Sequence, residues 1–112
     1  MPNSKLNLTD RDVCTIREAI TISLDNKDFY NGDMLFQSHL PGAIKLSRKL
    51  DSATRVTLNY NDLTAVMFVL AVAIDVLRSM KADGTDYLPI DEVLLTDCIS
   101  LDDRLARYLD LQ

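Results

Sequence analysis

Tryptophan is absent from this 112-residue chain, and other residues are scarce: there are one His, two Cys, three Gly and three Pro. Two cysteines are too few for a disulfide scaffold. With His39 they offer at most three soft metal ligands, in no C-x-x-C or H-E-x-x-H spacing, so we expect neither a metal site nor a cofactor. The shortage of glycine and proline leaves long uninterrupted segments, which favours helices over many short strands.

Catalytic groups are equally scarce. Nucleophilic catalysis needs a Ser or Cys beside a His base and an orienting carboxylate. His39 is the only histidine, and no serine lies in a nucleophile-elbow sequence. We expect His39 to be partly exposed in the first turn of a helix, and Cys14 and Cys98 to be small buried hydrophobic side chains. The sequence therefore favours a protein that is not an enzyme.

Charge is unevenly distributed along the chain, whose net charge is −5. Residues 83–112 contain eight acidic and two basic residues, whereas residues 1–82 contain nine acidic and ten basic ones. An acidic excess argues against nucleic acid as a partner over a broad face. The longest apolar run, Ala65–Ile74, would rise about 15 Å as a helix, half of the roughly 30 Å of a membrane core. We therefore expect a cytoplasmic protein with reduced thiols and no membrane contact.

Two helix starts carry the same capping signature. Thr9 is followed three residues later by Asp12, and Asn59 is followed three residues later by Asp62. Gly84 is suited to end the helix that Asn59 starts, because glycine readily adopts positive φ. We predict four helices: Thr9 to about Asp25, from between Ser38 and Pro41 to about Ser52, Asn59 to about Ala82, and from Pro89 onward.

Two of these helices leave alternatives open. Pro41 either starts the second helix, as proline in a first turn can, or lies inside a longer helix that Asp33 caps. In either case Ile44 is assigned to its inner face. The fourth helix either runs unbroken or splits near Ile99, and we prefer one helix because its apolar seam continues across that point. The residues of this seam are Leu94, Cys98, Leu101, Leu105 and Tyr108.

The third helix determines the predicted architecture. Its segment from Val66 to Leu77 is apolar around nearly its whole circumference, and such a helix must be covered on all sides. We predict an all-α, antiparallel four-helix arrangement with this helix in the centre, forming a single domain over residues 1–112 with residues 1–7 as a flexible tail. Three neighbours are barely enough to cover a helix completely, so we also predict a homodimer.

The basic residues of the second helix form the clearest candidate ligand site. Lys45, Arg48 and Lys49 are spaced i, i+3 and i+4 and therefore share one face, and Arg55 follows in the connector. Such a cluster suits a phosphate or a nucleotide. No glycine-rich phosphate loop accompanies it, and a solvated basic face is the plainer interpretation.

Candidate contacts for a macromolecular partner lie elsewhere. Phe29 and Tyr30 flank a turn, where they form either an exposed aromatic anchor or a lid over one end of the core. Asp75 interrupts the apolar third helix, and we interpret it as an outward-facing ion pair with Arg78 or as a buried polar contact at an interface. The acidic residues of the fourth helix that we assign to a partner contact are Asp97, Asp102 and Asp103.

These features favour a non-enzymatic interaction protein that binds another macromolecule. An accessory or inhibitor protein of bacterial or phage type fits the small size and the acidity. An acidic helix row could also imitate a nucleic-acid backbone towards a basic target. The alternative is a protein that binds an anionic small ligand, a nucleotide or phosphate, through the basic face of the second helix.

Overall fold

The structure is a computed structural model that describes residues 8–51, 58–84 and 86–110. These residues form four helices and no strand: α1 (Asp10–Asp25), α2 (Met34–Asp51), α3 (Tyr60–Asp83) and α4 (Pro89–Asp110). The predicted all-α class is confirmed. The predicted tail, residues 1–7, lies outside the described residues.

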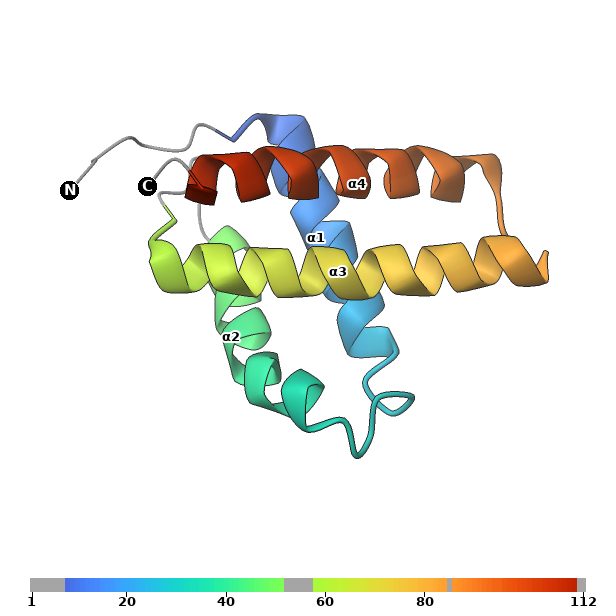
Figure 1. The fold of residues 1–112 in the computed structure, drawn as a ribbon, viewed down its shortest axis with the longest axis horizontal. Helices are drawn as coiled ribbons and strands as arrows, with labels where there is room; N and C mark the ends of the chain where they lie inside the picture. The colour runs from blue at the N-terminus through green and yellow to red at the C-terminus, as the bar shows by residue number, and fades with distance from the viewer. Residues whose placement is uncertain (1–7, 52–57, 85, 111–112) are drawn as a thin grey trace.

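The helices form two antiparallel pairs that cross each other. Figure 1 shows α3 and α4 side by side and running in opposite directions, with α1 crossing behind both and α2 reaching behind α3 only. α3 contacts each of the other three helices, and so does α1, whereas no contact joins α2 to α4 within the described residues. The predicted four-helix arrangement around α3 is thus confirmed, with α1 as a second hub.

Capping interactions start α1 and α3 as predicted. At each start the N-cap side chain accepts a hydrogen bond from the backbone N–H of the aspartate three residues later, and that aspartate accepts one from the N-cap N–H. The N-cap residues are Thr9 and Asn59, and their partners are Asp12 and Asp62. α3 ends at Gly84, whose φ of 68° is in the left-handed region.

Of the two alternatives for the second helix, the structure shows the longer one: α2 begins at Met34, and Pro41 lies inside it rather than starting it. Asp33 caps the first turn: its carboxylate accepts a hydrogen bond from the N–H of Phe36 at 3.0 Å. Phe36 is buried, and its packing anchors this turn to the core. The preferred form of the fourth helix is confirmed, because α4 runs through Ile99 without a break.

The core is formed mainly by α3 and the inner faces of its neighbours. Ile44 is 39% exposed rather than inward-facing, and Cys14 is exposed on α1, so both burial predictions were wrong. Cys98 is buried as predicted. The buried core residues are Ile16, Ala19, Ile20, Ala43, Leu46, Leu50, Leu63, Ala65, Val66, Val69, Leu70, Ala73, Cys98, Leu101 and Leu105.

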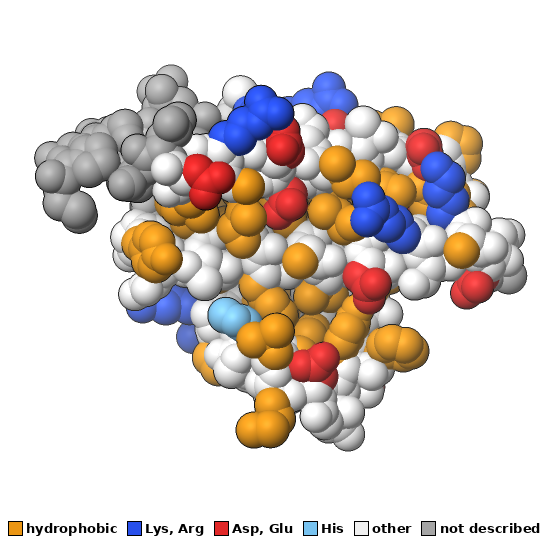
Figure 2. All heavy atoms as spheres, viewed as in Figure 1, with side chains coloured by type: hydrophobic (Ala, Val, Ile, Leu, Met, Phe, Trp, Pro, Cys, Tyr) orange, Lys and Arg blue, Asp and Glu red, His pale blue; other side chains and the backbone are white. Residues whose placement is uncertain are grey.

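One face of α3 is left uncovered by the other described helices. Four exposed residues lie on this face, at successive spacings of eleven, four and three: Tyr60, Ala71, Asp75 and Arg78. We call these four residues the open face of α3. Figure 2 views the side of the molecule formed by α3 and α4, where apolar side chains alternate with acidic and basic ones.

By length and composition alone α3 could also span a membrane, a property that it shares with core helices of soluble proteins.

Candidate functional site

The structure separates the predicted basic cluster. Lys45 and Arg48 are exposed on the outer side of α2. Lys49 turns towards α3 instead and forms an ion pair with Asp62, the aspartate of the α3 capping box. Arg55 lies outside the described residues. Of the four predicted cations, Lys45 and Arg48 are therefore left on the outer side of α2.

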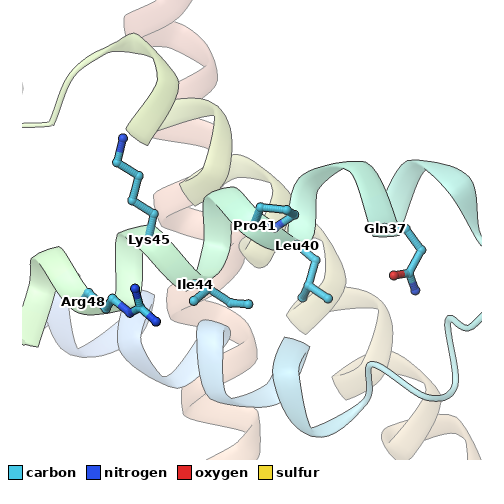
Figure 3. Close-up of a pocket in the computed structure, with 6 residues that line it drawn as sticks. All are labelled: Gln37, Leu40, Pro41, Ile44, Lys45 and Arg48. Atoms are coloured by element: carbon cyan, nitrogen blue, oxygen red, sulfur yellow. The ribbon is translucent and has the colours of Figure 1, made fainter.

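That surface is an open hollow of about 640 Å³ on the outer side of α2 (Figure 3). Figure 3 shows Lys45 pointing to one side of the helix, whereas Leu40, Ile44 and Arg48 point to the other. We call the residues that line the hollow the α2 ledge: Gln37, Leu40, Pro41, Ile44, Lys45 and Arg48. The ledge is apolar in its middle and basic towards the C-terminal end of α2.

Pro41 gives the ledge an unusual backbone. A proline inside a helix has no N–H to donate, so the carbonyl of the residue four positions earlier loses its helical partner. Here that carbonyl belongs to Gln37, which is itself part of the ledge. Pro41 and Gln37 are both exposed. The Gln37 carbonyl on the ledge therefore has no i+4 donor within α2.

Exposed apolar side chains continue beyond the ledge, into the first turn of α2 and the loop before it. Met34 is 85% exposed, Leu35 69% and Phe29 82%. Met34 lies three residues before Gln37 and so extends the outer face of α2 by one turn. Isolated exposed apolar residues are ordinary, but a contiguous row along one helix indicates a contact surface.

Phe29 and Tyr30 lie in different surroundings. The lid interpretation fits Tyr30, and the exposed-anchor interpretation fits Phe29. Tyr30 is half-buried and stacks on Phe36 with 4.7 Å between ring centroids, and its hydroxyl donates a hydrogen bond to Asp75 at 2.7 Å. Burial and this bond to a carboxylate raise the pKa of Tyr30 to about 12. Tyr30 thus acts as the lid, whereas Phe29 projects into solvent.

An aromatic chain continues from this lid into the molecule. The Phe36 ring meets Phe68 of α3 edge-on at 5.4 Å, and the imidazole of His39 stacks on Phe68 at 5.0 Å. His39 is half-buried and lies in the second turn of α2, not in the first turn as predicted. Sequence reasoning missed this cluster, although the i, i+3 spacing of Phe36 and His39 places both on one side of a helix.

The three predicted acidic contacts do not form a free acidic face. Asp97 accepts two hydrogen bonds from the guanidinium of Arg11, at 2.9 and 3.2 Å. Asp103 pairs with Arg107 at 3.0 Å. Asp102 is half-buried, and this burial together with neighbouring Asp103 raises its pKa. The acidic residues of α4 are therefore largely engaged within the molecule.

Two observations on the described residues concern metal binding and thiol chemistry. They contain no group of three or more His, Cys, Asp or Glu residues arranged to hold a metal ion. Burial, with Asp97 and Asp102 nearby, raises the pKa of the Cys98 thiol to about 12, so this thiol is a poor nucleophile at neutral pH.

The chain matches no family model, no curated protein and no solved structure. The fold and the site define it as a small four-helix protein with one partly apolar, partly basic helix face exposed to solvent.

Proposed function

We propose that this protein is a non-enzymatic interaction module that binds another macromolecule through the α2 ledge. The observation that carries the proposal is the row of exposed apolar residues on α2, whose opposite side is fixed to the core by Phe36, Ala43 and Leu46. A rigid helix with a half-apolar outer face is a common recognition surface. An accessory or inhibitor role in the cytoplasm of a bacterial or phage-infected cell fits this design.

Local irregularity at the ledge supports the proposal. A proline inside a helix costs about 3 kcal/mol relative to alanine. Pro41 is exposed, so it contributes little packing in return. Departures from local preference without a structural gain are concentrated at functional sites.

The alternative, an anionic small ligand at Lys45 and Arg48, is less well supported. Small-ligand sites enclose most of the ligand surface, whereas all the residues that line this hollow belong to one helix. Lys49, which would complete the cluster, pairs with Asp62. Thermal-shift measurement with nucleotides and phosphate tests this alternative, because a ligand that binds the folded state raises the melting temperature.

The proposal is tested by comparing affinity capture with the wild type and with Ile44→Asp. Ile44 is 39% exposed, so a carboxylate there is tolerated by the fold while it disrupts the apolar part of the ledge. Ser100→Asp, on the exposed side of α4, is the matched control. We expect a partner that is retained by the wild type and by the control but is lost with Ile44→Asp. The same set of proteins on all three baits would contradict the proposal.

A further inference from the structure

We infer that the partner element which occupies the α2 ledge is an amphipathic helix with acidic residues beside its apolar row. This inference rests on the proposed function and specifies the chemistry of the partner. It combines the shape of the ledge, its charge and the absence of a sheet edge among the described residues.

The shape of the ledge suits a helix. From Met34 to Arg48 the outer residues of α2 recur every three or four positions, over about 21 Å at 1.5 Å per residue. A row of this length matches about four turns of a second helix, whose i, i+3, i+4 and i+7 side chains would contact it. A peptide that binds by strand addition would need the free edge of a sheet, and the described residues contain no strand.

The charge of the ledge selects an acidic helix. Lys45 and Arg48 lie at one end, and none of the six described residues that line the hollow is acidic. Burial raises the pKa of Asp62, but the hydrogen bond from Lys49 lowers it. The nearby charge of Lys45 adds to this lowering. The two cations of the ledge, Lys45 and Arg48, thus stand out on a chain of net charge −5. An acidic partner is repelled elsewhere and attracted here, so charge fixes its orientation more than its affinity.

The centre of the ledge adds a hydrogen-bonding requirement. The Gln37 carbonyl, which lacks its i+4 donor because of Pro41, belongs to the apolar row between Met34 and Ile44. A backbone acceptor at an interface binds best when the partner supplies a donor. The bound helix therefore carries a Ser, Thr, Asn or Gln side chain near the middle of its apolar row.

Selection from a displayed library of random peptides, about 16 residues long, tests this inference. The immobilised wild type is the target, and peptides that bind Ile44→Asp equally well are removed. We expect the retained peptides to have apolar residues at helical spacing and an excess of Asp and Glu. Retained peptides that are neutral, basic or without helical periodicity would overturn the inference, and so would a failure to retain any.

Charge reversal provides the second arm of the test. The best peptide is labelled with fluorescein, and its affinity is measured by anisotropy. Arg48→Glu should weaken binding about tenfold, whereas Lys27→Glu, the same change on an exposed loop residue, should leave it unchanged. Equal affinities for both variants would contradict the assigned charge. Displacement of the peptide by inorganic tripolyphosphate at low micromolar concentration would identify an anion site instead.

Failure of this inference is distinguishable from failure of the proposed function. If the selected peptides are not acidic helices but capture of a native partner still depends on Ile44, the ledge is a docking site with a different occupant. If Ile44→Asp has no effect on capture, the function assigned to the ledge fails as a whole.

Discussion

Asp12 and Asp62 occupy equivalent positions in two helices, and each joins its helix to another one. Each carboxylate accepts the N-cap N–H of its own helix and also pairs with a cation from a neighbour, Arg104 of α4 for Asp12 and Lys49 of α2 for Asp62. Burial raises the pKa of both acids, but these hydrogen bonds outweigh it and hold the pKa below the ordinary value. The two aspartates therefore set local helix starts and tertiary contacts at once.

Replacement of Asp62 should reveal this double role through its pH dependence. We expect Asp62→Asn to lower the free energy of unfolding by about 1–2 kcal/mol at pH 7. Most of this loss comes from the cap, because Lys49 is partly exposed and its ion pair with Asp62 is therefore weakened by solvent. A carboxylate with a lowered folded pKa stabilises the protein above its ordinary pKa of about 4, and this contribution is lost as the pH falls through the folded pKa. The gap between wild type and variant should therefore narrow at pH 3.

Urea unfolding followed by circular dichroism at pH 7 and pH 3 measures this gap. Asp28→Asn, an exposed loop residue, is the matched control and should have almost no effect at either pH. If Asp62→Asn lowers the free energy of unfolding by the same amount at pH 7 and at pH 3, the negative charge of Asp62 is unimportant for stability.

Sequence reasoning found these aspartates but not their cationic partners, for a physical reason. A capping box is local, since its residues are three positions apart. Lys49 is 13 residues from Asp62 and Arg104 is 92 residues from Asp12, so these pairs exist only once the helices have packed. Lys49 was instead assigned to an anion site, because its spacing from Lys45 says nothing about an acid on another helix.

The two thiols should differ sharply in reactivity. Cys14 is exposed, whereas Cys98 is buried with its pKa raised to about 12. We expect a chromogenic disulfide reagent at pH 8 to modify one thiol per folded chain and two thiols in denaturant, since only an accessible thiolate reacts. Cys14→Ser should leave no reactive thiol in the folded state. Rapid modification of two thiols in the folded wild type would contradict the assigned burial of Cys98.

At the level of elements, α2 shows how tertiary contacts override a local signal. The sequence favoured a start between Ser38 and Pro41, because proline is best tolerated in a first turn. In the structure the cap at Asp33 and the burial of Phe36 hold an earlier turn in place. The hydrogen bond lost at Pro41 falls on the exposed side of the helix, where water can satisfy the carbonyl.

Pro41→Ala should stabilise the fold and weaken the ledge. Alanine restores an N–H for the Gln37 carbonyl, and we expect about 1–2 kcal/mol of stability after allowing for the more flexible unfolded chain. Because that carbonyl is then occupied, binding of the selected peptides should weaken. Urea unfolding and fluorescence anisotropy measure the two effects.

Gly42→Ala separates stability from binding. A Cβ at Gly42 would lie 3.7 Å from the Cβ of Ala65, which is ordinary van der Waals contact. We expect about 0.5–1 kcal/mol of added stability because alanine is the better helix former. Peptide affinity should stay as in the wild type. Equal losses of affinity in Gly42→Ala and Pro41→Ala would show that helix rigidity, not the free carbonyl, determines binding.

For the whole molecule, the sequence indicated the centre of the fold but not which side of the centre stays open. An α-helix that is apolar around its circumference is expected to be covered everywhere. The three neighbours bury nine of the 24 residues of α3 but leave its open face, on which Ala71 lies between Tyr60 and Asp75. Hydrophobic periodicity cannot specify this side, because the side depends on the angles at which α1 and α2 pass behind α3 (Figure 1).

A second copy of the chain is the partner that we predict for this open face. Asp75 and Arg78 lie on it one turn apart with opposite charges. Two such faces that meet antiparallel, with the two-fold axis between Asp75 and Arg78, place each aspartate near the arginine of the other chain. Light scattering after size exclusion should then give twice the chain mass of 12.6 kDa. Ala71→Arg, an exposed change at the middle of the face, should give the monomer mass with little change in melting temperature. Ser100→Arg on α4 should remain dimeric. A wild type that elutes as a monomer up to about 100 µM would end the dimer prediction and leave the α2 ledge as the surface on which association depends.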